Sequence, residues 1–357
     1  MGESEGQSPS DQTDVRILIA GLGAIGQRHA RNLRALHTAS GDDLELLAYR
    51  RRRLTHVVTE ALQRDDSRNV ETELGVTVFG DLDEALAARP DAVFVCTPSS
   101  QHLEIAQRAA EAGCHLFIEK PVSHTLDGLA RLRETVAAKA LVAVVGCQWR
   151  WHPSVLGLRG LLQSGEFFGE LIDAEIEYRE YLPDWHPYED YRASYAARAD
   201  FGGGVVLTQI HDYDLAWWLF GPARRVTATG GHLSDLDVEV EDTVDARLEG
   251  GAAPVRIRQT FAERPPRRII RVTGDDASAT VDLLTGRVES TVTSVASGLT
   301  VADYPRNNMF MDVVQNFLAC MAGERPPATP LDDGIEVLKL ALAVKDAIRT
   351  GRTVEIM

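Results

Sequence analysis

The first half of the chain alternates short apolar runs with segments of helical periodicity. The first run, VRILIA, covers residues 15–20, and further runs cover 44–50, 76–79, 91–98, 115–121 and 141–148. Between them the periodicity predicts helices at about 25–37, 101–112 and 125–139. Strands that are apolar along their whole length and alternate with helices are typical of a parallel sheet covered on both faces. We therefore predict an α/β domain over residues 15–148.

The pattern changes after residue 148. A helix is predicted over about 154–164, and LIDAEIEYREYL (171–182) then alternates polar and apolar residues. Several more alternating strands follow, then helices near 307–322 and 331–349, with TVEIM as a possible edge strand. Such alternation indicates a sheet with one polar face. We predict a second, α+β domain over 149–357 with an open, mainly antiparallel sheet, and a disordered acidic tail over 1–14.

Composition and charge narrow the classes of function. The 357 residues fit two domains of about 100–200 residues each. The net charge of −16 argues against a general nucleic-acid partner. No apolar run approaches a membrane span and the N-terminus lacks a secretory pattern, so we expect a cytoplasmic protein without a membrane partner. The four cysteines lack metal-ligand spacing, so we expect reduced thiols and no metal site.

A glycine-rich loop follows the first strand directly. Residues 21–26 read GLGAIG, the pattern G-x-G-x-x-G, between a predicted strand and a predicted helix. Glycines there permit a tight turn and a close approach of backbone to a pyrophosphate, and the helix N-terminus supplies free N–H groups. This context predicts a Rossmann domain whose cofactor-binding residues include Gly21, Gly23, Ala24, Ile25 and Gly26.

The end of the second strand bears on the choice of cofactor. NAD-binding domains usually place an acidic residue there, to bind the ribose 2′-hydroxyl. This chain has YRRRR at 49–53, with Arg50 at the acid position. Arg50 and Arg51 are suited to a 2′-phosphate, so NADP is favoured over NAD. The alternatives are an NAD enzyme without the acid and a solvated arginine run.

Three further motifs carry chemistry. CTPSSQH (96–102) follows the fourth strand and EKP (119–121) ends the fifth, both at the carboxyl edge where open α/β sheets bind ligands. A lysine there can stabilise a developing oxyanion. GGGVVLTQIH (202–211) opens an apolar helix and ends on a histidine that can act as acid or base. The aromatic and polar residues before this glycine run, Tyr191 among them, suit a sugar ring. The alternative is a lid that packs against a partner subunit.

Together these motifs resemble the glucose–fructose oxidoreductase, inositol dehydrogenase and MocA family. The matching pieces occur in family order: G-x-G-x-x-G-x-x-H ending at His29, T-P-x-x-x-H, E-K-P, R-W-H-P (150–153) and G-G-G…H-x-x-D. The stretch 181–204 also resembles a subgroup associated with nucleotide sugars and surface polysaccharides. The resemblance covers nearly the whole chain from residue 15.

The resemblance implies hydride transfer between a nicotinamide and a sugar or polyol carbon. It implies that Lys120, ahead of a cis Pro121, binds the reacting oxygen and that His211 is the acid or base. The implied cofactor contacts add Cys96, Thr97, Pro98, His102, Glu119 and Lys120, and the implied substrate contacts are Lys120, Arg150, Tyr191, Thr208 and His211. Arg150 has a structural ion pair as its alternative role, and His29 is expected to pack or to cap a helix.

One departure from the family pattern concerns the catalytic set. Many members carry an aspartate three or four residues before the histidine, where this chain has Thr208 and Leu207. A threonine can form hydrogen bonds but holds no charge. Either His211 works with Lys120 alone, or another acid such as Asp212 assists it, or the redox activity is changed.

These observations favour an NAD(P)-dependent oxidoreductase that acts on a CH–OH or C=O carbon of a sugar, polyol or nucleotide-sugar. One alternative is an NAD-dependent glycosidase that oxidises its substrate transiently. Another is a non-catalytic sensor of NAD(P) or sugar, which the missing acid near Thr208 would fit. An exposed face of the second sheet would favour a homodimer or homotetramer.

Overall fold

The computed structural model describes residues 15–40, 43–52, 55–301 and 303–356, so the predicted tail over 1–14 lies outside the described residues. The first half forms a six-stranded sheet in the order β5-β2-β1-β6-β7-β8, in which every pair is parallel. This strand order is that of a Rossmann domain, as predicted. The strands are β1 (Val15–Ala20), β2 (Leu44–Tyr49), β5 (Thr77–Phe79), β6 (Ala92–Val95), β7 (His115–Ile118) and β8 (Ala143–Val145).

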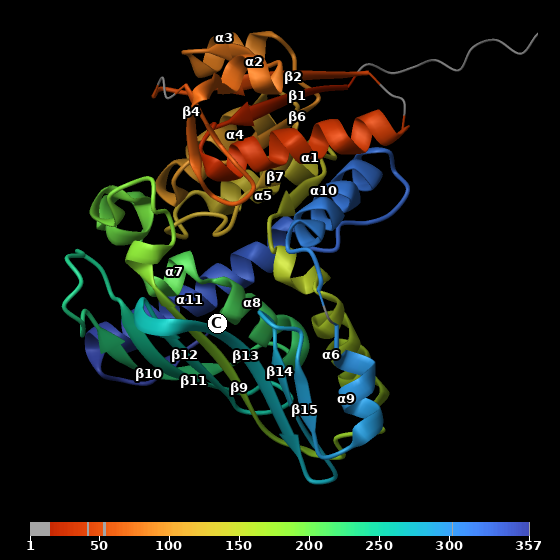
Figure 1. Cartoon of the computed structure of the whole chain (residues 1–357), viewed down its shortest axis with the longest axis vertical. Helices are drawn as coiled ribbons and strands as arrows, with labels where there is room; N and C mark the ends of the chain where they lie inside the picture. The colour runs from red at the N-terminus through yellow and green to blue at the C-terminus, as the bar shows by residue number, and fades with distance from the viewer. Residues whose placement is uncertain (1–14, 41–42, 53–54, 302, 357) are drawn as a thin grey trace, which may run out of the picture.

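Helices cover this sheet on both faces (Figure 1). They are α1 (Ala24–Ser40), α2 (Val70–Leu74), α3 (Leu82–Ala87), α4 (His102–Glu111) and α5 (Leu129–Ala138). A two-stranded hairpin, β3 (His56–Val58) and β4 (Arg64–Asn69), was not predicted, because RDDSRN carries no apolar alternation. Gln27 of α1 holds the hairpin, since its Oε1 accepts a hydrogen bond from the Val58 amide at 2.7 Å.

The second half forms an eight-stranded sheet in the order β15-β14-β13-β9-β12-β11-β10-β16. Only the pair of β9 with β12 is parallel, so the predicted mainly antiparallel sheet is confirmed. The last strand pairs with β10 at the sheet edge, as expected for TVEIM. The strands are β9 (Leu171–Tyr181), β10 (Arg225–Gly231), β11 (Thr243–Glu249), β12 (Val255–Thr260), β13 (Ala262–Gly274), β14 (Ser278–Asp282), β15 (Val288–Ser290) and β16 (Val354–Glu355).

Three helices lie between the two sheets. Figure 1 shows α7 (Val205–Thr208), α8 (His211–Phe220) and α11 (Leu331–Thr350) in this position, above the inner face of the large sheet. The remaining helices are α6 (Pro153–Ser164), α9 (Thr293–Leu299) and α10 (Asn307–Met321). Short 3-10 turns cover Ser99–Gln101, Gln148–Trp151, Leu182–Asp184, Tyr191–Ala193, Tyr195–Ala197 and Ala199–Phe201. The residues after the glycine run therefore meet the carboxyl edge of the first sheet.

The chain returns to the first sheet near its C-terminal end. Val313, Val314 and Phe317 of α10 share one buried cluster with Phe94 and Phe117, whose rings stack at 4.5 Å between centroids. The Val145 amide of β8 also donates to the Thr329 oxygen at 2.9 Å, just before α11. These contacts join the two halves, while the predicted division after residue 148 stays a prediction.

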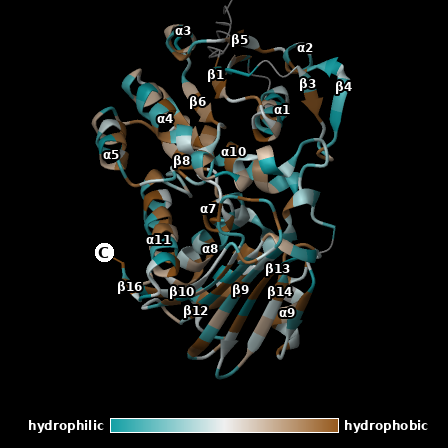
Figure 2. Ribbon diagram, turned by 90° about the vertical axis from the view of Figure 1, so that its left-hand side faces the viewer, coloured by the Kyte–Doolittle hydropathy of each residue, from teal (hydrophilic) through white to brown (hydrophobic). Residues whose placement is uncertain are grey.

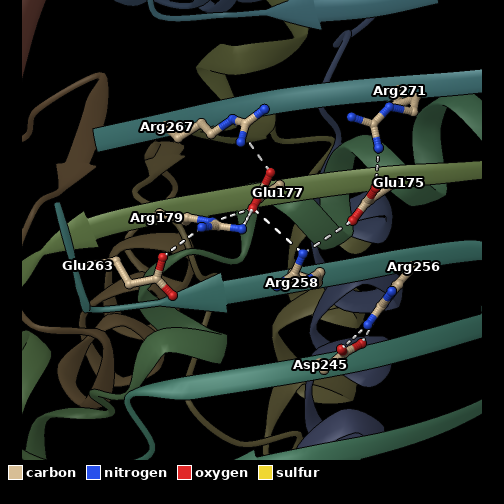
Figure 3. Close-up of polar contacts among 9 residues, drawn as sticks. All are labelled: Glu175, Glu177, Arg179, Asp245, Arg256, Arg258, Glu263, Arg267 and Arg271. Atoms are coloured by element: carbon tan, nitrogen blue, oxygen red, sulfur yellow. Dashed lines mark hydrogen bonds and ion pairs between the residues drawn. The ribbon is translucent and has the colours of Figure 1, made fainter. Parts of the chain in front are cut away.

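The outer face of the large sheet carries charged side chains (Figure 3). No helix of the described part of the chain covers that face (Figure 2). Glu177 lies almost buried among three arginines, bonded to Arg179 and 3.9 Å and 3.6 Å from Arg258 and Arg267. Further pairs across the strands join Arg271 to Glu175, Arg256 to Asp245 and Arg179 to Glu263. The alternation predicted for this sheet thus yields one apolar and one ion-paired face.

Two expectations from composition can be compared with the structure. The four cysteines are free and buried. Within the described ranges, no helix is long and apolar enough to cross a membrane.

A buried histidine makes part of the stability depend on pH. His152 caps α6, its Nδ1 accepting from the Ser154 amide at 3.2 Å, and its ring packs on Trp149 and Tyr304. Burial lowers the pKa of His152 from 6.5 to about 4. Between these values the unfolded chain binds a proton that the folded protein excludes, so this histidine costs stability as the pH falls below 6.5.

We predict that His152→Asn reduces this acid sensitivity. Asparagine keeps a capping oxygen but does not titrate. From pH 7 to pH 5 the free energy of unfolding of the unmodified protein should fall by about 2 kcal/mol more than that of the variant. Chemical denaturation at the two pH values measures this difference. Equal losses in the two proteins would show that His152 does not titrate as described.

Candidate active site

The glycine loop has the shape that a pyrophosphate requires. Gly21 has φ +103° and lies against the Cys96 carbonyl, which an added Cβ would meet at 2.8 Å. A Cβ on Gly26 would lie 1.9 Å from the Gly21 oxygen, so the loop packs against the helix too closely for any side chain at this position. A Cβ on Gly23 would meet nothing within 4 Å. The open side at Gly23, where Ala24 and Ile25 start α1 with unpaired amides, fits a dinucleotide phosphate.

The arginines after β2 have different surroundings. Arg50 is buried and forms an ion pair with Glu71, at the first turn of α2. Arg51 is exposed and its Nε donates to the Tyr49 hydroxyl at 3.0 Å. The side chain with the more accessible guanidinium is therefore Arg51, although Arg50 holds the position that is acidic in many NAD-binding domains.

The loop after β6 is tied to the loop after β7 by a buried histidine. The two ring nitrogens of His102 each lie 2.8 Å from a carbonyl oxygen, those of Thr97 and Pro121. The Thr97 Oγ1 is buried without a hydrogen-bond partner among the described residues, beside Pro98 at the sheet edge. Burial, and then the charge of Glu119, raise the pKa of Cys96, so that thiol stays protonated. His102 thus holds the two loops together, and the Thr97 hydroxyl is left without a hydrogen-bond partner among the described residues.

Lys120 joins the first sheet to the second domain. The Lys120–Pro121 peptide is cis, as predicted. The Lys120 Nζ donates to the Thr208 backbone oxygen, the last residue of α7, at 2.9 Å. Burial lowers the pKa of Lys120, the charge of Glu119 raises it, and that of Arg268 lowers it. The side chain still keeps some solvent exposure, so a substrate oxygen can approach it.

His211 begins α8 close to this lysine. Its Nε2 lies 3.4 Å from the Gln148 Nε2, and its Nδ1 has no partner among the described residues. The Thr208 hydroxyl, also buried, likewise lacks a partner in that part of the chain. Burial lowers the pKa of His211 well below its usual value, and the charges of Lys120, then Arg268 and Arg306, lower it further. His211 is therefore neutral near pH 7 and can accept a proton.

Asp212 does not assist His211 directly. Its two carboxylate oxygens accept from Arg268 at 2.7 Å and from the Gln259 amide at 2.8 Å. Arg268 itself lies over the rings of Trp149 and Tyr178, 4.7 Å from each centroid. No carboxylate in the described ranges is bonded to His211. Of the alternatives left open by the sequence, the geometry favours His211 working with Lys120 alone.

Arg150 is held by carboxylates instead of being open to a substrate. Its guanidinium binds both oxygens of Asp214, at 2.6 Å for the shortest contact, and donates to Asp333 at 2.7 Å. A third acceptor is the Ala328 carbonyl oxygen at 3.2 Å. Asp214 thereby anchors the 148–151 turn to α8. The geometry therefore favours the alternative role of Arg150, a buried structural ion pair, and the substrate contact stays a prediction.

The segment before the glycine run places its two tyrosines differently. The Tyr191 hydroxyl accepts from the Asp237 amide at 3.1 Å, so it supports the neighbouring loop. Burial raises the pKa of the Tyr195 hydroxyl, and the charge of Glu119 raises it further. Sequence reasoning placed Tyr191 in the site and gave no specific role to Tyr195, Gln148 or Arg268. Nothing in the sequence marks Arg268, because its hydrogen-bond partners Asp212 and Gln209 lie 56 and 59 positions away.

Proteins of known name resemble the chain over nearly its full length. A scyllo-inositol 2-dehydrogenase (NAD(+)) of Bacillus subtilis is 26% identical over 360 residues, 96% of each chain. A UDP-N-acetylglucosamine 3-dehydrogenase of Acidithiobacillus ferrooxidans is 26% identical and covers 94% of this chain and 97% of its own. The WlbA dehydrogenase of Bordetella pertussis, solved with NADH and UDP-GlcNAcA, has the same fold, with a TM-score of 0.78 at 23% identity, over 97% of this chain and 99% of that one.

Two family models match successive parts of the chain. The model described as an oxidoreductase family with an NAD-binding Rossmann fold matches residues 15–147. The model of the GFO/IDH/MocA C-terminal domain matches residues 155–280. The glycine loop, open at Gly23, and the unpaired Thr97 hydroxyl are consistent with a nicotinamide dinucleotide at the first domain. The chain therefore belongs to the GFO/IDH/MocA oxidoreductase family and is an NAD(P)-dependent oxidoreductase, as its motifs predicted.

Proposed function

We propose that the protein transfers hydride between a nicotinamide and the CH–OH or C=O carbon of a sugar, polyol or nucleotide-linked sugar. The observation that carries this proposal is the meeting of Lys120 and His211 between the two domains. Lys120 comes from the edge of the first sheet and reaches the Thr208 oxygen, three residues before His211. A neutral base can accept the proton of an alcohol, and a cation beside it can stabilise the oxyanion that results.

The cofactor would be held by residues of the first domain. Gly21, Gly23 and Gly26, with the amides of Ala24 and Ile25, would hold the pyrophosphate. Thr97 and Pro98 after β6 and Glu119 after β7 would border the nicotinamide half. When bound, the nicotinamide supplies the hydride acceptor or donor. We favour NADP, because the exposed Arg51 suits a 2′-phosphate.

The roles of the chain's own groups follow from their charge states. In the direction of oxidation, His211 takes the hydroxyl proton, since its ring is neutral and at least one nitrogen lacks a strong partner. Lys120 then stabilises the oxyanion at the same oxygen. The Thr208 hydroxyl, which has no partner among the described residues, would bind a second substrate hydroxyl. In the direction of reduction the same groups work in reverse.

Two further features bear on the substrate and on assembly. Arg306 is exposed and forms no ion pair within the described ranges, yet its charge acts on both Lys120 and His211. A free arginine near the site suits the phosphate of a nucleotide-linked sugar. We also propose a cytoplasmic homodimer or homotetramer that buries the charged outer face of the large sheet.

We predict that Lys120→Met abolishes turnover while cofactor binding persists. Removing one donor to an oxyanion costs about 10²-fold or more in kcat. Sugar-dependent change in NAD(P)H absorbance measures turnover, and fluorescence titration measures the cofactor Kd, expected within threefold of the unmodified protein. Lys139→Met, on the exposed end of α5, is the matched control. Full activity in the Lys120 variant would overturn the proposed roles, and product formation without any absorbance change would favour transient oxidation.

We predict that Gly23→Ala weakens cofactor binding without weakening the fold. The new Cβ meets no protein atom within 4 Å but enters the space assigned to the pyrophosphate. The cofactor Kd should rise about tenfold or more while the unfolding temperature stays the same. Gly26→Ala is the contrasting variant, because its Cβ would clash with the Gly21 oxygen and should destabilise the protein. Unchanged cofactor affinity in the Gly23 variant would place the pyrophosphate elsewhere.

We predict that Arg51→Ala weakens the binding of NADPH and leaves the binding of NADH nearly unchanged. Loss of a guanidinium–phosphate contact should raise the Kd for NADPH about tenfold and leave that for NADH within twofold. Fluorescence titrations with the two cofactors provide the comparison, NADH serving as the internal control. If the unmodified protein binds NADH more tightly than NADPH, the preference for NADP is wrong.

A further inference from the structure

His29 makes a contact that its sequence position did not predict. It lies on α1, three residues after the last glycine of the loop, and its side chain is fully buried. Instead of packing only or capping the helix, it binds Glu119 across 90 residues of sequence, with 2.7 Å between Nε2 and Oε1. Glu119 directly precedes Lys120. One contact therefore joins the helix of the glycine loop to the catalytic lysine.

The Glu119 carboxylate is fixed from several sides. Its Oε2 accepts from the Lys120 backbone amide at 3.3 Å. The backbone of Gly146 lies against it, since a Cβ there would come within 3.1 Å of Oε1. The His29 ring is in turn enclosed by aromatic rings, with Phe94 and Phe117 at 5.5 Å and 4.9 Å between centroids. Both side chains are thus held on several sides in the positions that make this contact.

The contact also sets the charge beside Lys120. Burial raises the pKa of Glu119, but the hydrogen bond and charge of His29, with the charges of Lys120 and His102, lower it by more. Glu119 is therefore ionised near neutral pH. Because a carboxylate oxygen of Glu119 can only accept, the hydrogen of this contact lies on the His29 Nε2. The Nδ1 of His29 has no partner among the described residues. His29 acts as a donor that stabilises a buried anion.

We propose that His29 is a positioning residue, which by donating to Glu119 keeps that carboxylate ionised and fixed, and so keeps Lys120 charged and in place. The proposal rests on the proposed function, because it concerns the lysine that turnover requires. It assigns to the histidine of the glycine-loop motif a task in the catalytic step, separate from the phosphate contacts of the loop.

A physical consequence follows for the pH range of activity. A buried carboxylate that loses its donor binds a proton or moves to solvent. Lys120 then loses the anion that raises its pKa, while burial still lowers that pKa. The other groups that act on Lys120 are Cys147, Arg268 and Arg306, and the nearby His211 is neutral. The lysine should therefore lose its proton at lower pH, and the alkaline limit of kcat should move with it.

The test compares His29→Leu, His29→Gln, Glu119→Gln and the double variant His29→Leu/Glu119→Gln. We expect His29→Leu to lower kcat about tenfold and to move its alkaline limit down by about one pH unit. His29→Gln retains an N–H donor, so it should keep most of the original kcat and most of the original alkaline limit. Because His29 acts through Glu119, His29→Leu should add less than twofold in kcat when Glu119→Gln is already present.

Two further readouts separate positioning from a structural role. The cofactor Kd, measured by fluorescence, should stay within threefold in His29→Leu and His29→Gln. Asn32→Ala is the matched control, since Asn32 is a buried polar residue of α1 that accepts from Asn307 at 2.9 Å and does not contact Glu119. It should lower the unfolding temperature without moving the alkaline limit of kcat.

Several outcomes would overturn the proposal. One is an unchanged alkaline limit in His29→Leu, and another is an effect that adds fully to that of Glu119→Gln. If His29→Leu does not fold, the Glu119→Gln variant provides the test. An unchanged pH profile of kcat in that variant rejects the proposal. An active Lys120→Met variant would instead reject the proposed function, whereas an inactive Lys120→Met with an unshifted His29→Leu rejects only the role of His29.

Discussion

The hydrogen bond from the Lys120 ammonium to the Thr208 backbone oxygen marks the place where we propose that the chemistry occurs. It joins the carboxyl edge of a parallel sheet to the first helical turn after a glycine run in the other domain. Neither domain alone brings the lysine to His211, so the two must be held in register. The return of α10 and α11 to the first sheet, through Phe317 and Thr329, supplies that constraint with apolar packing and backbone bonds.

Burial and the positive charges around the Lys120–Thr208 hydrogen bond keep His211 neutral. Lys120, Arg268 and Arg306 all disfavour an imidazolium at His211, and burial disfavours it further. Asp212, the carboxylate next in sequence, is held by Arg268 and Gln259 and so does not restore the charge. Thr208 and Leu207 stand three and four residues before the histidine, where the resemblance led us to expect an aspartate, and a neutral base beside a lysine remains. Proton transfer then depends on Lys120 staying charged, which Glu119 supports.

The sequence predicted the elements that a periodic pattern or a motif specifies. The apolar runs predicted the parallel sheet, and G-x-G-x-x-G located the loop whose open side lies at Gly23. The polar hairpin β3–β4 was not predicted, because RDDSRN lacks the alternation of apolar and polar residues that is typical of a strand. The motifs marked Lys120 and His211, whose catalytic roles stay a prediction. The partners of Arg150 and His29 lie 64 and 90 positions away in the sequence. Such pairings follow from the packed fold and carry no local signal.

The central claim is that one substrate oxygen is shared by Lys120 and His211 while the reacting carbon faces the nicotinamide. A crystal structure of the protein with its cofactor and a sugar or nucleotide-sugar substrate measures this most directly. The account predicts that the Lys120 Nζ and one ring nitrogen of His211 lie within about 2.6–3.2 Å of the same oxygen, with the Gly23 side of the loop on the pyrophosphate. A substrate oxygen bound away from either group would contradict the account.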